Sequence, residues 1–349
     1  ARIEQAAEHA VKSDRSEVQA WTALGHAHVF RCIYEITRSG SSANSCERAK
    51  TAFASALAIE SGDPQANNGL GNAHRWAAVS LYQTGHDPTA EYEDALRSYG
   101  VASKIAPHNL YACVNRLDLH ASLVEYQAEV GVDPQAHLSK AREVGAECSR
   151  IDRKYYLVYE HLARSELGRA RYLESRGDLD GVQDALERAS RYLDEDEAAT
   201  PGTMAAKYWR LVAVVMRARS RLRGREDPTR LIAQGRALMT DPALTNTPIA
   251  LVESARLGLI AAQWAAANEG SAQSLRARAL RDAETATGHA HWLADAQLVA
   301  AEACYAIATA QRSRELAKRG VDHVDNALRL DPQFAAAKQL RGKLEQLAR

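Results

Sequence analysis

The sequence predicts an all-α protein, a superhelical solenoid of about seven antiparallel helix hairpins that ends in a C-terminal capping helix. Three observations support this fold class: a composition rich in alanine, leucine, arginine and glutamate, the lack of long β-branched runs, and a repeat of about 46 residues. Alanine and straight-chain residues lose little rotamer freedom in a helix, whereas strands favour β-branched and aromatic residues. Only 6% of the residues are aromatic, so strands are not expected.

The repeat is visible in positions that recur at one interval. Those in phase are Gly25 and Gly71; His28, His74 and His120; and the breaks GHDP at 85–88 and GVDP at 131–134. Several positions in one phase are much harder to obtain by chance than a single matched motif. A single helix hairpin cannot bury its apolar face alone, so a fixed period of this length indicates hairpins stacked in series.

Glycine near the end of one helix and proline at the start of the next punctuate the hairpins. Residues 1–14 are expected to form the second helix of an earlier, truncated hairpin, which suggests a longer protein upstream. The complete hairpins are expected at 16–61, 64–107, 108–152, 153–194, 203–240, 247–287 and 289–331, and the capping helix at 334–349. Residues 40–42 separate the helices of the first complete hairpin, and the fourth is expected to have a slightly shorter second helix.

An acidic segment with proline and glycine, DEDEAATPGT at 194–203, is predicted to divide the chain, because these two residues are the strongest local breakers. The N-terminal repeats then occupy 1–193. The more degenerate C-terminal repeats and the capping helix occupy 203–349.

Charge and cysteine usage narrow the functional class. The chain has 44 basic and 44 acidic residues, so no global field favours nucleic acid or an anionic membrane as a partner. The five cysteines are scattered singly, which we interpret as reduced thiols in a reducing compartment, with Cys113 and Cys148 packed as small apolar residues on facing helices. With no signal peptide and no run of 18 apolar residues, we expect a cytoplasmic protein without a membrane span.

The sequence contains no pattern that points to catalysis. Nucleophile elbows, zincin motifs and kinase motifs are absent, so neither an enzyme nor a cofactor is predicted. The triplet HAH occurs at 26–28 and 289–291, but residues i and i+2 point to nearly opposite sides of a helix. We therefore predict no metal site, and interpret His28, His74 and His120 as packed polar residues.

The early hairpins share a pattern of residue types. The first helix carries a large residue, then leucine and glycine; the second carries alanine, an aromatic residue and alanine, followed by proline. The matching residues are Trp21, Leu24, Gly25, Ala49, Phe53 and Ala56 in the first complete hairpin, and Leu70, Gly71, Ala95, Tyr99, Ala102 and Pro107 in the second. This pattern resembles the tetratricopeptide repeat family. Its longer period is similar to the repeat regions that follow the kinase domain in some bacterial serine/threonine kinases.

The resemblance implies a right-handed superhelix whose first helices line a concave groove that clasps an extended peptide. Mapped by phase, the peptide-binding residues are His26, Asn68, Asn72, Arg75, Asn115, Asp118, His161 and Arg164. Asn72 and Asn115 occupy places where the family often uses asparagine to hold a peptide backbone, and a side-chain amide offers both a donor and an acceptor. Replacing both by alanine is expected to weaken partner binding with little loss of fold.

We therefore expect a non-catalytic scaffold that binds a protein or peptide, as the docking or sensing region of a larger bacterial signalling protein. Three alternatives stay open. The polar groove wall could be solvated without a ligand. The alanine-rich hairpins five to seven could self-associate into a homo-oligomer. A pocket near 194–203 could make the chain the small-molecule-sensing arm of a regulator.

Overall fold

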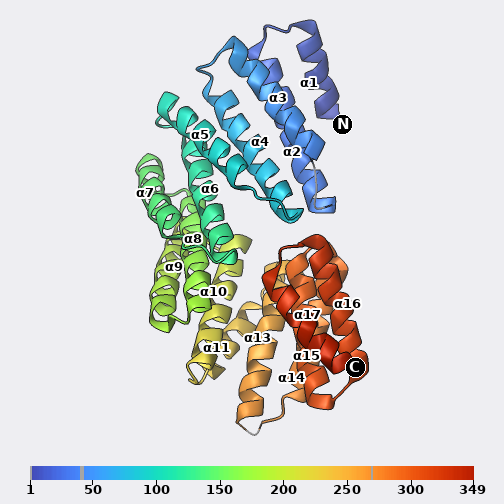
Figure 1. Ribbon diagram of the computed structural model, residues 1–349. Coiled ribbons are helices and arrows are strands. Elements are labelled where there is room, and N and C mark those ends of the chain that lie inside the picture. Colours follow the sequence, from blue (N-terminus) through green and yellow to red (C-terminus); the bar gives the residue numbers. More distant parts are fainter. Residues whose placement is uncertain (1, 40–42, 269) are drawn as a thin grey trace. The chain divides into compact units, whose positions relative to one another are not determined.

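The computed structural model describes residues 2–39, 43–268 and 270–349. All helices and strands assigned in these ranges are α-helices, which confirms the predicted fold class (Figure 1). The described helices are α1 (Arg2–Ser13), α2 (Val18–Ser39), α3 (Ala43–Ile59), α4 (Pro64–Gln83), α5 (Thr89–Ile105), α6 (Leu110–Glu129), α7 (Gln135–Ile151), α8 (Tyr156–Arg176), α9 (Leu179–Ala199), α10 (Met204–Arg223), α11 (Thr229–Leu238), α12 (Pro242–Thr245), α13 (Pro248–Ala267), α14 (Gln273–His289), α15 (Ala294–Gln311), α16 (Arg314–Leu330) and α17 (Ala335–Ala348).

The helix boundaries follow the predicted 46-residue period. The first helices of four hairpins, α2, α4, α6 and α8, begin at 18, 64, 110 and 156, and the second helices α3, α5 and α7 begin at 43, 89 and 135. From α1 to α7 each helix packs on the next one along the chain, and α2 also packs on α4; the same holds from α12 to α17. The chain divides into two compact units, Ala1–Ser165 (unit 1) and Glu166–Arg349 (unit 2). The predicted division at 194–203 stays a prediction.

Three glycines end the first helices of successive hairpins in the same way. Gly85, Gly131 and Gly177 each have a φ of +77°, the left-handed region that costs other residues a steric penalty. The amide that follows each glycine reaches back to a carbonyl five residues earlier, as Val132 N does to Gln127 O at 2.8 Å. This is the 6→1 hydrogen bond of a Schellman cap. The structure therefore confirms the breaks predicted at 85–88 and 131–134; the break predicted at 40–42 lies outside the described residues.

Gly131→Ala is expected to lower the free energy of unfolding by about 1–2 kcal/mol, because alanine at positive φ is strained. Gly100→Ala is the matched control. Gly100 is inside α5, where an added Cβ meets nothing within 4 Å, so alanine is expected to stabilise by up to about 1 kcal/mol. Urea unfolding of the two variants measures both changes. Shifts of the same sign would contradict the backbone assignment.

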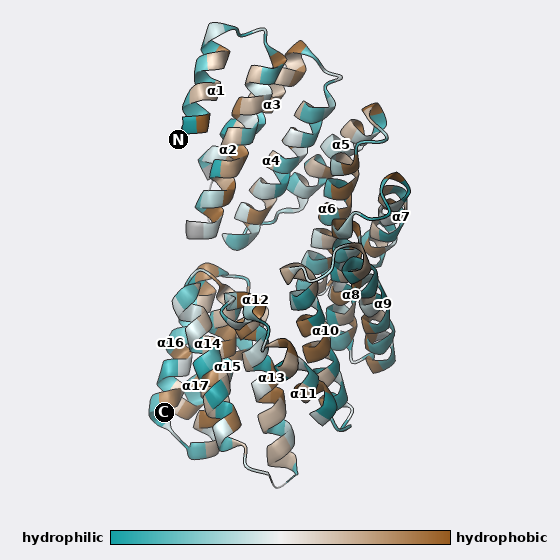
Figure 2. Ribbon diagram, turned by 180° about the vertical axis from the view of Figure 1, so that it is seen from behind, coloured by the Kyte–Doolittle hydropathy of each residue, from teal (hydrophilic) through white to brown (hydrophobic). Residues whose placement is uncertain are grey.

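Small residues allow the helices of unit 1 to approach closely. A Cβ added at Gly25 would lie 2.7 Å from the ring of Phe53, and one added at Gly71 would lie 2.5 Å from the ring of Tyr99. Both rings are fully buried. Figure 2 shows apolar and polar segments side by side on the helices, as expected when each hairpin buries one face against its neighbours.

Unit 2 keeps the hairpin pattern with two differences from the expectation. The second helix of the fourth hairpin, α9, has 21 residues and is longer than α3, α5 and α7, because residues 194–199 continue the helix. A short extra helix, α12, precedes α13. The capping helix is confirmed as α17, whose Leu340 and Leu344 pack in a core cluster with Val324 of α16. Among the described residues, α13 alone is long and apolar enough to cross a membrane, by length and composition, and half of its most apolar 18-residue window is buried inside the fold.

The interpretation of the cysteines as unpaired thiols is wrong. Cys113 of α6 is bonded to Cys148 of α7, and Cys32 of α2 is bonded to Cys46 of α3. Cys304 is free and buried. The paired Cα atoms are 5.7 and 5.3 Å apart, inside the range that a disulfide spans without moving the backbone. The repeat places Cys113 and Cys148 on facing helices, as expected, but it does not indicate that the two sulfur atoms are bonded. The pair Cys32–Cys46 is not predicted by the sequence.

Candidate functional site

Four of the predicted groove residues occupy one position of the repeat. His26, Asn72, Asp118 and Arg164 are 46 residues apart, on α2, α4, α6 and α8. We call these four residues the first-helix row. Capping residues fix where the first helices begin, and so which residues share this repeat position. Before α4, the carboxylate of Asp63 accepts a hydrogen bond from the Ala66 amide at 2.5 Å. The side chain of Asn109 caps α6 in the same way.

Asp118 is the centre of a charge network in unit 1. It is 8% exposed, and its two oxygens face guanidinium groups on the preceding and the following first helix. Arg75 of α4 lies with Nη2 2.7 Å from Oδ2, and Arg164 of α8 donates from Nη1 to Oδ1 at 2.7 Å. A single buried carboxylate therefore joins three consecutive hairpins.

Arg164 uses the other side of its guanidinium to hold Glu125, seven residues after Asp118 on α6. Nη2 donates to Oε2 at 2.6 Å and Nε to Oε1 at 3.4 Å, the two-pronged geometry that suits arginine and a carboxylate. Nη1 also lies 3.2 Å from Nδ1 of His161. An arginine only donates, so His161 accepts through Nδ1 and is neutral there.

The environment lowers the pKa values of both Asp118 and His161, for different physical reasons. Burial alone would raise the pKa of Asp118, but the facing charges of Arg75 and Arg164 hold it well below its usual range. Burial lowers the pKa of His161 to about 4, with Arg164 adding to the effect and Asp118 opposing it. Two cations and two carboxylates then balance, and the histidine adds no charge at neutral pH.

The shifted histidine predicts a pH dependence of stability. Because the folded pKa of His161 is about 4 and the unfolded value is about 6.5, the unfolded chain binds the proton first, and stability falls as pH drops from about 6.5 to about 4. His161→Gln is expected to flatten the stability profile in this window, as measured by urea unfolding at several pH values. A profile that keeps the slope of the unaltered chain would contradict the assignment.

The remaining predicted residues make separate contacts. Tyr99 of α5 donates its hydroxyl to Oδ1 of Asn72 at 2.7 Å. Asn115 of α6 donates from Nδ2 to Oδ1 of Asn68 on α4 at 3.0 Å. His26 packs edge-on against the ring of Phe53, with ring centroids 5.1 Å apart, and does not join the charge network.

The contact of Asn72 changes what its substitution is expected to do. Asn72→Ala leaves the hydroxyl of the fully buried Tyr99 without its acceptor, which costs about 1–3 kcal/mol of unfolding free energy. The expectation that Asn72 can be replaced with little loss of fold is therefore revised. In Asn72→Ala/Tyr99→Phe both polar partners are gone, so most of the loss should be recovered. Chemical unfolding of the single and double variants checks this, and equal losses would contradict it.

Sequence reasoning missed Glu125 and Tyr99 as partners. The sequence gives a weak indication for Glu125: it lies seven residues, or two helical turns, after Asp118 and so on the same face of the helix. Tyr99 fits the repeat pattern, which gives no sign of a hydrogen bond to Asn72.

The periodic histidines, as predicted, are packed polar residues: His74 Nδ1 lies 2.6 Å from Glu91 Oε2, and His120 is buried beside His137. Within the described ranges no cluster of three His, Cys, Asp or Glu residues suits a metal ion.

No family model matches the chain, and no curated protein sequence does. A tetratricopeptide repeat protein from Parabacteroides merdae is similar in structure, with a TM-score of 0.52 and 13% identity over 92% of this chain and 98% of that one. The Cut9–Hcn1 structure from the APC/C has a TM-score of 0.46 at 10% identity over 92% of this chain, and yeast Tom70 has 0.46 at 12% over 93%. This chain spans 55% and 64% of those two chains. The hairpin series, its 46-residue register and the likeness to the Parabacteroides merdae protein show that this chain has a tetratricopeptide-like helical-repeat fold.

Proposed function

We propose that the chain is a non-catalytic protein-interaction scaffold that holds an extended peptide along the first helices of unit 1. The observation that supports this most is the pair Asn68–Asn115. Their one mutual hydrogen bond uses Asn115 Nδ2 and Asn68 Oδ1, and both side chains are partly exposed. Asn68 Nδ2 and Asn115 Oδ1 thus offer a donor and an acceptor on neighbouring helices, the complement of a peptide group.

The charge network beside this pair favours a neutral peptide segment. The charges of Arg75 and Arg164 are balanced by Asp118 and Glu125 inside the fold. A strongly acidic or basic peptide would have to break these pairs and leave a buried charge without a partner, which costs several kcal/mol. We further propose that the chain serves as the docking or sensing region of a larger signalling protein.

The test uses peptides selected from a random displayed library on the full chain, with the tightest binder as the probe for calorimetric titration. Asn68→Ala/Asn115→Ala is expected to weaken its binding by about tenfold, the loss of one or two hydrogen bonds. Gln135→Ala is the matched control, because it removes an exposed amide on the second helix α7. Failure to select any peptide, or equal affinities for the three proteins, would overturn the proposal.

A further inference from the structure

A cavity of about 390 Å³ lies in unit 1 between the second and third complete hairpins. Its lining comes from the end of α5, the segment 107–109, the first two turns of α6 and the end of α7. Described helices precede and follow both hairpins along the chain, so the cavity is not at an end of the repeat series. It includes no residue of the first-helix row or of the pair Asn68–Asn115, and so it does not depend on the proposed peptide site.

One repeat position explains why there is room here. Its residues are Trp21, Asn67, Cys113 and Tyr159, which are 46 residues apart. Three of them donate a side-chain hydrogen bond to the carbonyl oxygen six residues earlier: Trp21 to Arg15 at 2.9 Å, Asn67 to Ser61 at 3.3 Å and Tyr159 to Arg153 at 2.8 Å. Cys113 is short and is bonded to Cys148, so it has no hydrogen to donate and leaves the space beside Pro107 open.

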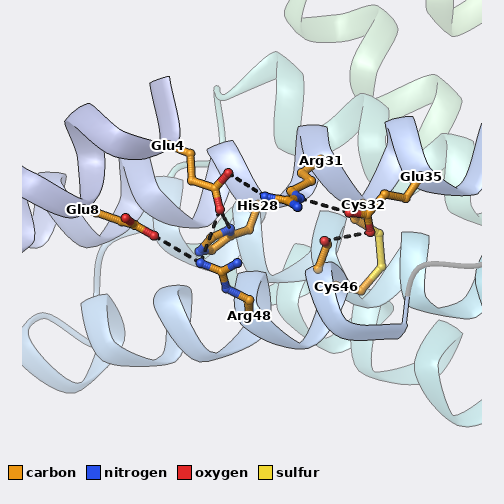
Figure 3. A network of polar contacts seen from close by, with 9 residues as sticks. Glu4, Glu8, His28, Arg31, Cys32, Glu35, Cys46 and Arg48 are labelled. Atoms are coloured by element: carbon orange, nitrogen blue, oxygen red, sulfur yellow. Dashed lines mark hydrogen bonds and ion pairs between the residues drawn. A yellow bond between two sulfur atoms is a disulfide. The ribbon is translucent and has the colours of Figure 1, made fainter. Parts of the chain in front are cut away.

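The disulfide also holds one wall of the cavity in place. Cys113–Cys148 joins the first turn of α6 to the last turn of α7, where one hairpin is connected to the next. The other disulfide of unit 1, Cys32–Cys46, joins the second half of α2 to the first turn of α3, at the opposite end of its hairpin (Figure 3). Because α6 and α7 are bonded at the cavity, this wall is formed before anything binds, which avoids the cost of ordering it.

Arg116 places a charge at a repeat position where the other first helices of unit 1 carry leucine. The equivalent residues are Leu24, Leu70 and Leu162, of which the first and last are 8% and 5% exposed. Arg116 lines the cavity and pairs with Glu147 through Nη2, but its buried Nε has no hydrogen-bond partner. A buried donor without an acceptor costs stability, and leucine would pack here without that cost. The guanidinium therefore indicates a role other than packing.

Two further cations line the cavity, one from α5 and one from α7. Lys104 and Arg150 share one repeat position, which the second helices before and after them fill with Ala58 and Asp196. Among the described residues neither of these two cations makes an ion pair, so Glu147 is the one carboxylate that faces three positive charges in the lining. The lining residues therefore leave two positive charges unbalanced.

We propose that this cavity binds a small phosphate monoester. The phosphate group of a monoester carries nearly two negative charges at neutral pH, which matches the two unbalanced cations. Arginine suits a phosphate because its planar guanidinium donates to two oxygen atoms at once, and the hydroxyl of Ser103, buried without a partner, is a further donor in the lining. The volume exceeds what a phosphate alone fills and is typical of small-molecule sites, so the organic group of the ester lies beside Pro107 and Ile151.

The experiment titrates the purified chain, with its disulfides intact, at fixed ionic strength in a calorimeter. The probes are inorganic phosphate and four monoesters: glycerol 3-phosphate, ribose 5-phosphate, phosphoserine and phenyl phosphate. At least one monoester is expected to bind with a Kd of about 1 mM or below and to raise the unfolding temperature. Glycerol, ribose, serine and phenol, which lack the phosphate, are the matched controls and should not bind. No binding of any monoester, binding of inorganic phosphate alone, or equal binding of the controls would overturn the proposal.

Substitutions test whether this cavity is the site. Arg116→Leu restores the leucine of the other hairpins, so the fold should be kept, and binding of the tightest monoester should weaken by at least about tenfold. Lys104→Gln/Arg150→Gln, at two exposed residues, should weaken it similarly.

Arg230→Leu is the matched control, because it removes the same charge from an exposed position on α11. Unchanged affinity in either cavity variant, or an equal loss in Arg230→Leu, would overturn the proposal. Asn68→Ala/Asn115→Ala should leave monoester binding intact, so this test and that of the peptide site fail separately.

Discussion

Asp118→Ala is expected to lower the free energy of unfolding by about 3–5 kcal/mol, the usual cost of removing one partner of a buried ion pair. The substitution leaves Arg75 without its carboxylate and takes from Arg164 one of its two. The cost comes mainly from a buried cation left without compensation. Urea unfolding followed by circular dichroism measures it.

Asp94→Ala is the control for this prediction. Asp94 also pairs with an arginine, Arg97, but both side chains are exposed, so its loss should cost no more than about 1 kcal/mol. Similar losses for the two variants would contradict the buried network.

The pH dependence of stability gives an independent check. The folded pKa of Asp118 lies below the unfolded value of about 4, so the contribution of Asp118 to the free energy of unfolding is complete above that pH and declines as the pH falls below it.

Removing the disulfide between α6 and α7 by Cys113→Ser/Cys148→Ser is expected to cost about 3–4 kcal/mol. The two cysteines are 35 residues apart, and opening a loop of this length returns that much chain entropy to the unfolded state. For Cys32 and Cys46, 14 residues apart, the same argument gives about 3 kcal/mol. Thermal and urea unfolding with and without a reducing agent measure both effects.

A chain with all four of these cysteines replaced by serine is the control, because a reducing agent should then have no effect on stability. Alkylation under denaturing, non-reducing conditions gives a direct count, and one modified cysteine, Cys304, is expected. Five modified cysteines would contradict the two bonds. The expectation of a reducing compartment depended on all five cysteines being unpaired, and that premise is wrong. Disulfides persist mainly in oxidising compartments. The cytoplasmic location stays a prediction that alkylation of the protein in intact cells can test.

The tertiary contacts show that most of the predicted site residues bind one another inside the fold. The family pattern predicts separate peptide contacts for Arg75, Asp118, His161 and Arg164, whereas the structure joins these side chains to one another. Asn68 Nδ2 and Asn115 Oδ1 take no part in the hydrogen bond between these two side chains, whereas Asn72 accepts from the buried Tyr99. Repeat phase placed these residues on equivalent faces of successive first helices. It carried no information on which of them would pair.

The sequence by itself determined the helices, their order and the turns that end them, because these depend on residues close together in the chain. The glycines at 85, 131 and 177 and the cap at Asp63 act within one or two helical turns. Only the tertiary structure decided that Asp118 pairs with Arg164 and that Cys113 is bonded to Cys148, because these contacts depend on how residues 30 or more positions apart are oriented when their helices pack.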